Sequence, residues 1–241
     1  MAYSETSSDP VIQVRDLVTH YGSRQILNGV SLDIHDGEIM VVMGGSGSGK
    51  STLMRHMLAL ESPTTGTVRV LGVDVNHASR AEMQSLRRRI GVAFQSGALF
   101  SSMTVGENIM LPLHEYGEAK HDPQTMRIMM RMKLEVVDLA GFESLMPAEL
   151  SGGMIKRAAF ARAVVMDPRV LFCDEPSAGL DPAVASAIDD LILRLREAFG
   201  MTIVVVTHEL DSAFKIADRI TILDKGDILF VGSTDEVRNH T

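Results

Sequence analysis

The sequence lacks the features that mark secreted, membrane-spanning and nucleic-acid-binding proteins. It contains a single cysteine, Cys173, which excludes an intramolecular disulfide framework and fits a reducing compartment. No apolar run approaches the roughly 20 residues needed to span a bilayer, and the polar start MAYSETSSDP lacks a signal-peptide pattern. With 23 basic and 31 acidic residues, the net charge of -8 argues against a general nucleic-acid binder. We therefore expect a cytoplasmic protein that reaches a membrane only through a partner.

The composition is that of a folded globular domain. Apolar residues make up 45% of the 241 residues and charged residues 22%, and the chain is long enough for one domain with two lobes. Residues 11–22 and 26–38 alternate as strands do, and residues 39–43 (IMVVM) are continuously apolar, as in a buried parallel strand. Further strands are predicted at 67–75, 88–95, 169–176 and 202–209, with a hairpin at 218–233 that turns at Lys225-Gly226.

From residue 96 to about 153 the strand pattern gives way to a methionine-rich helical one. Four apolar residues fall on one face of a predicted helix: Met126, Met130, Leu134 and Val137. We therefore predict a single α/β domain over residues 1–241, with a mainly parallel core sheet and an antiparallel strand cluster near the N-terminus. The core and its β subdomain comprise residues 1–95 and 156–241, and a helical lobe is inserted at about 96–155.

Residues 44–51 (GGSGSGKS) match the phosphate-loop pattern G-x-x-x-x-G-K-[ST] in full. Glycines let the backbone curl so that N–H groups converge on phosphate oxygens at a helix N-terminus. Lys50 would place its charge on the β- and γ-phosphates, and the Ser51 hydroxyl can bind Mg²⁺. A buried strand before the loop and a helix after it favour a nucleotide site over a flexible turn. The residues assigned to the nucleotide are Gly44, Gly45, Ser46, Gly47, Ser48, Gly49, Lys50, Ser51 and Thr52.

Two carboxylates end the apolar segment VLFCDE, at the edge of a parallel sheet where ligands bind. Asp174 is suited to hold Mg²⁺, because a hard cation prefers oxygen ligands. Glu175 can orient or deprotonate an attacking water. By themselves the two residues fit a solvated acidic turn equally well, but the phosphate loop favours the catalytic interpretation. Cys173 lies within the strand and is expected in the core.

Two further polar residues are predicted at the carboxyl ends of strands. His208 follows the apolar run of TIVVVTHE, where it can hydrogen-bond a γ-phosphate and keep a catalytic water aligned, although a lone histidine is usually structural. Gln95 ends RRIGVAFQ, and a neutral amide suits sensing of water or metal rather than strong binding.

The segment ELSGGMIKRAAFARA, residues 149–163, predicts a second anion site. Ser151 is a good N-cap, and Gly152 and Gly153 expose N–H groups at the start of a helix predicted from Met154 to Ala163. One ATP could use both this turn and the phosphate loop only if the two belong to different subunits. The pattern therefore predicts a head-to-tail dimer with two composite sites, and an ordinary capped helix is the alternative.

These motifs together resemble those of the ATPase subunit of ABC transporters, over essentially the whole chain. They occur in the order of that family: the phosphate loop, the Q-loop glutamine Gln95, the signature at 150–154, the Walker B residues Asp174 and Glu175, the D-loop at 177–181 and the switch histidine His208. The resemblance implies a P-loop NTPase with a RecA-like core, active with ATP and Mg²⁺.

The resemblance also assigns roles to particular residues. Catalysis falls to Lys50, Gln95, Glu175 and His208, and Mg²⁺ binding to Ser51, Gln95 and Asp174. Tyr21 resembles the aromatic residue that stacks on adenine, and ordinary packing is its alternative. The nucleotide contacts supplied by the signature and the D-loop are Ser151, Gly152, Gly153 and Asp181.

ABC ATPases form two-fold dimers that close around two ATP molecules, with Ser151 and Gly153 of one subunit on the γ-phosphate held by the other. The resemblance implies a membrane permease that docks between Gln95 and Leu113. Leu99, Phe100 and Met103 are apolar loop residues that suit such a surface, and burial within the lobe is the equal alternative.

Met154 stands where most members of the family have glutamine. LSGGM, together with QSGALF after Gln95, resembles the subgroup that powers Mla- and Mce-type lipid transporters, which move phospholipid between the inner and outer membranes of bacteria. This implies a peripheral position on the cytoplasmic face of the inner membrane, with a periplasmic Mce-type lipid-binding protein and, in some systems, a STAS-domain regulator. Some of these ATPases extend a C-terminal tail onto the neighbouring subunit, and this chain stops at Thr241, close to where that tail would begin.

Two other functions fit the same catalytic motifs. One is the ATPase of an importer for amino acids or another small solute. The other is a soluble ABC ATPase of iron–sulfur cluster assembly, which has no permease. DNA-repair ATPases are disfavoured because the coiled-coil insertion is missing, and ribosome-associated ones because there is a single ATPase unit.

Replacing the phosphate-loop lysine tests the nucleotide site. Lys50→Ala should lose both nucleotide affinity and hydrolysis, because the charge that faces the β- and γ-phosphates is removed. Binding of a fluorescent ATP analogue and release of phosphate measure the two effects. Unchanged binding would overturn the assignment of the loop.

Overall fold

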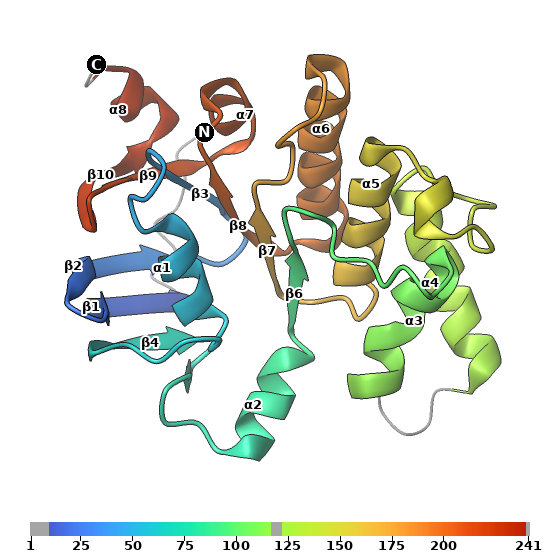
Figure 1. Ribbon diagram of the computed structural model, residues 1–241, viewed down its shortest axis with the longest axis horizontal. Coiled ribbons are helices and arrows are strands. Elements are labelled where there is room, and N and C mark those ends of the chain that lie inside the picture. The colour runs from blue at the N-terminus through green and yellow to red at the C-terminus, as the bar shows by residue number, and fades with distance from the viewer. Residues whose placement is uncertain (1–9, 117–121, 240–241) are drawn as a thin grey trace, which may run out of the picture.

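The computed structural model describes residues 10–116 and 122–239. They form two sheets and the helices that cover them, with an antiparallel sheet at one end of the molecule and helices α3 (Val105–Tyr116) and α4 (Pro123–Val136) at the other (Figure 1). The core sheet lies between these two ends. The α/β class, with a mainly parallel sheet and a separate antiparallel sheet near the N-terminus, is as the sequence predicts.

The core sheet contains β3 (Ile39–Met43), β6 (Ile90–Ala93), β7 (Val170–Asp174), β8 (Thr202–Thr207), β9 (Arg219–Asp224) and β10 (Asp227–Ser233). Their order is β10-β9-β3-β8-β7-β6. Neighbours from β9 to β6 pair in parallel, and β10 pairs with β9 as the predicted antiparallel hairpin. β3 and β8 are buried along their whole length, which explains their continuously apolar sequences.

The antiparallel sheet contains β1 (Ile12–Tyr21), β2 (Arg24–Ile34), β4 (Thr65–Val70) and β5 (Val73–Asp74), in the order β2-β1-β4-β5. The prediction of one strand over 67–75 is wrong. A turn at Leu71 and Gly72, with φ of 51° and 81°, breaks it into β4 and β5. The strand predicted to end at Gln95 is also shorter, because β6 ends at Ala93 and the Gly97 amide turns back onto the carbonyl oxygen of Phe94 (2.8 Å).

The remaining helices cover the sheets or cap their edges: α1 (Lys50–Met57), α2 (Arg80–Arg87), the 3₁₀ helix η1 (Pro147–Glu149), α5 (Gly152–Ala163), α6 (Pro182–Phe199), α7 (Leu210–Ile216) and α8 (Thr234–Asn239). α5 begins two residues before the predicted Met154. As predicted, α4 buries Met126, Met130 and Leu134 along one face. Within residues 10–116 and 122–239, none of the helices combines the length and apolar character needed to cross a membrane.

Asp-Pro pairs start α4 and α6. Asp122 accepts hydrogen bonds from the amides of the second and third residues after it (2.8 and 3.0 Å), and Asp181 does the same (3.2 and 3.1 Å). The proline that follows each aspartate lacks an amide hydrogen that would have no partner in the first turn. Each pair satisfies the free amides of a helix start and so determines where that helix begins.

The core sheet separates two hydrophobic cores, because alternate side chains of a strand point to opposite faces. From β3, Ile39, Val41 and Met43 enter the core shared with α3, α4, α5 and α6. Met40 and Val42 enter the core shared with α1 and the antiparallel sheet. The sheet therefore holds the helical end and the antiparallel end of the molecule to one framework.

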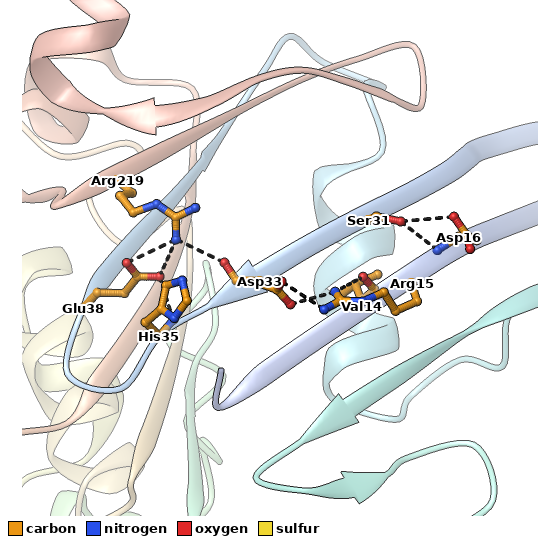
Figure 2. A network of polar contacts seen from close by, with 8 residues as sticks. All are labelled: Val14, Arg15, Asp16, Ser31, Asp33, His35, Glu38 and Arg219. Atoms are coloured by element: carbon orange, nitrogen blue, oxygen red, sulfur yellow. Dashed lines mark hydrogen bonds and ion pairs between the residues drawn. The ribbon is translucent and has the colours of Figure 1, made fainter. Parts of the chain in front are cut away.

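An arginine of β9 ties the core sheet to the antiparallel sheet (Figure 2). Arg219 Nη1 donates to the carbonyl oxygen of Asp33 in β2 (3.2 Å) and to the carboxylate of Glu38 (3.1 Å). Glu38 in turn accepts from the amide of His35 (2.8 Å), which closes the turn between β2 and β3. Within the antiparallel sheet, Arg15 of β1 pairs with the carboxylate of Asp33 in β2 at 2.7 Å.

Figure 2 contains a matched pair of arginines for a stability test. Arg219→Met should lower the free energy of unfolding by about 1–3 kcal/mol, because the largely buried Glu38 loses its cation. Arg15→Met should cost less than about 1 kcal/mol, because the paired side chains of Arg15 and Asp33 are 45% and 37% exposed, well above the 11% of Glu38. Urea denaturation followed by far-UV circular dichroism measures both. Equal losses for the two variants would contradict the role of Arg219 as the tie between the sheets.

Candidate nucleotide site

The carboxyl ends of three parallel strands meet at one edge of the core sheet. Met43 at the end of β3 pairs with Thr207 at the end of β8, and Asp174 at the end of β7 pairs with the residue before Thr207. The segments that follow these strands therefore start at the same level. As predicted, this edge brings together the phosphate loop, the Asp174-Glu175 pair and His208.

Close approach requires glycine at two points of the loop between β3 and α1. Gly44 has a φ of 155°, and a Cβ there would lie 2.1 Å from the carbonyl oxygen of Leu223 in β9. Gly49 has a φ of 108°, and its Cβ would lie 2.8 Å from a side chain of β2. The loop curls around its own lysine, since Lys50 Nζ donates to the carbonyl oxygens of Gly44 (2.8 Å) and Gly45 (2.9 Å).

The polar atoms at this edge fit a magnesium nucleotide. Within the described residues, Oδ1 of Asp174 and Oγ of Ser48 are buried without a hydrogen-bond partner. Burial raises the pKa of Asp174 and nearby Glu175 adds to the rise, while Arg55 and Lys50 oppose it. A hard cation would satisfy the carboxylate, and phosphate oxygens would satisfy the hydroxyl and the ammonium.

Glu175 and His208 are in direct contact. Nδ1 of His208 donates to Oε1 of Glu175 at 2.8 Å, and Oγ1 of Thr207 lies 3.4 Å from the other carboxylate oxygen. The Glu175 amide donates to the carbonyl oxygen of Val206 in β8 (2.8 Å), and its φ of 46° turns the chain sharply away from β7. The carboxylate is thus held from two sides, while the His208 side chain is 60% exposed and faces the edge of the sheet.

Tyr21 lies beside the phosphate loop, where the resemblance requires it. With Arg24, Ile26 and residues 47–52 it lines a pocket of about 220 Å³, and its side chain is partly exposed. Its hydroxyl donates to the Glu61 carboxylate and lies 3.4 Å from Oγ1 of Thr52. Nothing in the sequence of the segment after α1 links Glu61 to a tyrosine 40 residues earlier, so this contact was not predicted.

Lys156 also lies at this edge of the core sheet, where the sequence pattern did not predict a role for it. Its ammonium donates to the carbonyl oxygens of Gln95 and Glu175, and the side chain is buried. Burial lowers the pKa of Lys156, and the carboxylates of Glu175 and Asp174 counteract that effect. The sequence offers no signal that separates Lys156 from Arg157 and Arg162 in the same helix.

The signature residues lie apart from the pocket at the phosphate loop. Ser151 caps α5 by accepting from the Met154 amide (3.3 Å), and its side chain is exposed. A Cβ on Gly153 would lie 2.7 Å from Val184 of α6, so the glycine turn packs tightly on that helix. Asp181, the residue predicted from the D-loop, caps α6 next to this turn. Among the described residues, the signature and Asp181 do not line the pocket that contains Lys50 and Tyr21.

An apolar groove of about 510 Å³ lies beside β6 and α3. Phe94 and Phe100 line it and are exposed, and half-buried Leu111 of α3 lines it as well. Leu99, by contrast, packs against the core of the helical end. The sequence left open whether the apolar residues of the loop after Gln95 form a docking surface or are buried in the lobe. Phe100 lies on the groove surface, whereas Leu99 is partly buried against the core.

Comparison with known proteins identifies the family. Residues 27–178 match the model of the ABC transporter family. The chain is 37% identical over 228 residues to the intermembrane phospholipid transport ATP-binding protein MlaF of Haemophilus influenzae, covering 94% of this chain and 85% of that protein. It is 42% identical over 214 residues to the methionine import ATP-binding protein MetN of Mannheimia succiniciproducens, covering 88% of this chain and 60% of that protein.

A solved structure gives the same assignment. The dimeric, post-hydrolysis state of the ATP-binding cassette MJ0796 bound to ADP and Pi superposes with a TM-score of 0.84 at 31% identity, covering 92% of this chain and 98% of that one. The order of the strands, the geometry of the phosphate loop and the similarity to these relatives all indicate the same family. This chain belongs to the ABC transporter family, as an ATP-binding cassette.

Proposed function

We propose that this chain is the ATP-hydrolysing subunit of a membrane transporter. The observation that carries the proposal is the Glu175–His208 contact at the same sheet edge as Asp174 and the phosphate loop. A carboxylate held in place by a histidine beside a nucleotide phosphate is positioned to take a proton from an attacking water. MJ0796, whose structure resembles this one, was captured after hydrolysis with ADP and Pi.

Each residue of the edge has a distinct part in this reaction. Lys50 and the amides of the phosphate loop bind the β- and γ-phosphates, and the ring of Tyr21 stacks on the adenine of the nucleotide. Ser51, Asp174 and Gln95 would hold Mg²⁺, whose positive charge would offset the charge that develops on the phosphates. Glu175 is the general base and His208 orients it, because the 2.8 Å contact fixes one carboxylate oxygen and leaves the proton acceptor beside the phosphates.

A second copy of the chain completes the site. Ser151, Gly152 and Gly153 present amides at the start of α5 but lie outside the pocket of their own chain, and Asp181 is adjacent. A head-to-tail homodimer brings this turn onto the γ-phosphate bound by the partner subunit. The dimeric state of MJ0796 supports this arrangement.

The groove beside β6 is the proposed docking site for the permease. Its apolar lining and the exposure of Phe94 and Phe100 suit an apolar partner segment, and it borders the loop that begins at Gln95. Motion of that loop on nucleotide binding would be passed to the permease between Gln95 and Leu113. The chain would then be peripheral, on the cytoplasmic face of the inner membrane.

The proposed cargo is phospholipid, moved between the inner and outer membranes of a bacterial envelope. LSGGM and QSGALF support it, as does the similarity to MlaF over 85% of that protein. A periplasmic Mce-type lipid-binding protein and a STAS-domain regulator would then be partners. The similarity to MetN supports the competing function, an importer ATPase for an amino acid.

Replacing the general base tests hydrolysis and dimer closure together. Glu175→Gln should keep ATP binding but lower kcat by about a hundredfold or more, because the amide cannot accept the proton. ATP should then trap a dimer, detectable by size-exclusion chromatography with light scattering. Glu197→Gln, an exposed change near the C-terminal end of α6, is the matched control and should hydrolyse ATP normally. Turnover by Glu175→Gln equal to that of the unmodified chain would refute the role of Glu175.

The cargo is tested on the intact complex. The tagged chain is purified from membranes of its own host, and mass spectrometry identifies the co-purifying subunits and bound lipid. A permease, an Mce-domain protein and phospholipid would support the proposal. A permease with a solute-binding protein for an amino acid, or a soluble iron–sulfur scaffold without a permease, would replace it with one of the alternatives.

A further inference from the structure

α5 carries a buried cation about one turn after the exposed glycine turn that starts it. The Lys156 side chain is only 7% exposed, although the preceding residues Ser151 and Gly152 are at the surface. Its ammonium donates to the backbone carbonyl oxygens of Gln95 and Glu175, the latter at 3.2 Å. One side chain therefore connects three segments that are distant in sequence: α5, the loop after β6 and the end of β7.

Burial of this ammonium needs compensation. A charged group that leaves water loses several kcal/mol of solvation unless hydrogen bonds and opposite charges replace it. The two carbonyl oxygens supply the hydrogen bonds, and the carboxylates of Glu175 and Asp174 supply the opposite charge. An apolar side chain could occupy the same space without that cost, so the lysine contributes something other than filling the core.

α5 holds the loop after Gln95 at further points. Arg162, two turns along the helix, donates to the carbonyl oxygens of Gly97 (2.9 Å) and Ala98 (2.7 Å). A Cβ on Gly97 would lie 2.7 Å from the Ile155 side chain, so loop and helix are in close contact there. The loop is thus fastened along one side of α5, and Lys156 is the contact nearest the nucleotide.

The contact with Glu175 fixes the backbone of the proposed general base. Its carbonyl oxygen also accepts from the Ala178 amide (3.2 Å), and its amide donates to Val206 of β8 (2.8 Å). With Lys156, the peptide groups on both sides of Glu175 are held. The left-handed φ of 46° at this residue needs such support, since a non-glycine residue adopts that conformation only when its surroundings hold it there.

We propose that Lys156 is a positioning residue that fastens the backbones of Gln95 and Glu175 to α5 at the nucleotide site. In the proposed dimer, the glycine turn at the start of α5 faces the partner's nucleotide. Through Lys156, that turn moves together with Gln95 and Glu175 of its own subunit. The inference rests on the proposed function for its effect on catalysis. The fastening itself does not depend on hydrolysis.

The test compares Lys156→Met with a matched variant, Lys133→Met. Lys133 is also buried, pairs with Asp167 and lies over the Phe199 ring (4.1 Å), outside the nucleotide site. Both variants lose one buried ammonium and keep an apolar side chain of similar length. Hydrogen–deuterium exchange in the presence of MgATP, followed by mass spectrometry, reports on the loop after Gln95 and on residues 175–178.

In Lys156→Met, the backbone amides of these two segments should exchange about threefold or more faster than in the unmodified chain, because their hydrogen bonds open more often. The exchange rate of the phosphate loop should not change. Lys133→Met should leave both segments as in the unmodified chain. In steady-state kinetics, Lys156→Met should lower kcat by about tenfold or more with little change in KM for ATP.

Unaltered exchange at both segments in folded Lys156→Met overturns the proposal. So does an equal increase in Lys133→Met, because the effect would then follow from loss of any buried lysine. If the unmodified chain binds MgATP but does not hydrolyse it, the proposed function fails, and the exchange comparison still decides whether Lys156 fastens the two segments.

Discussion

The parallel hydrogen bonding of β3, β8 and β7 is the constraint on which the site depends. Parallel pairing sets Met43 opposite Thr207 and brings Asp174 to the same level, so three chain segments leave the sheet at one edge. The loop after β3 is the proposed phosphate site, the end of β7 supplies carboxylates and the end of β8 supplies the histidine. A shift of one residue between β7 and β8 would separate Glu175 from His208, which are 2.8 Å apart, and a shift between β3 and β8 would displace the loop after β3 from both.

The two faces of the same sheet serve different parts of the function. One face packs against α1 and the antiparallel sheet, which together hold the phosphate loop and Tyr21. The other packs against α3, α4, α5 and α6, which carry the signature turn and border the apolar groove. The groove is also lined by Leu58 and Leu60, on the α1 side, so it lies at the β6 edge of the core sheet, next to the loop that begins at Gln95.

Charge at the edge is balanced within a small buried region. Lys50 and Lys156 are buried cations, and Asp174 is a carboxylate whose pKa is raised by burial and by Glu175. The lysines direct their ammonium groups to backbone carbonyl oxygens, so they hold the loops without pairing directly with the carboxylates.

The sequence by itself determined the class of fold and the common sheet edge at which the predicted phosphate loop, Asp174, Glu175 and His208 lie. Continuous apolar strands specify a buried parallel sheet, and the ends of such strands share an edge, so local pattern and elementary geometry were enough. The same local pattern misjudged where strands end: Leu71-Gly72 turns the chain between β4 and β5, and the turn at Phe94 places Gln95 beyond β6. Only the tertiary structure decided which distant groups meet. Tyr21 contacts Glu61, and Lys156 contacts Gln95 and Glu175, which are 19 to 61 positions away in the sequence. The packing of separate elements brings these residues together, and no local sequence pattern predicts it.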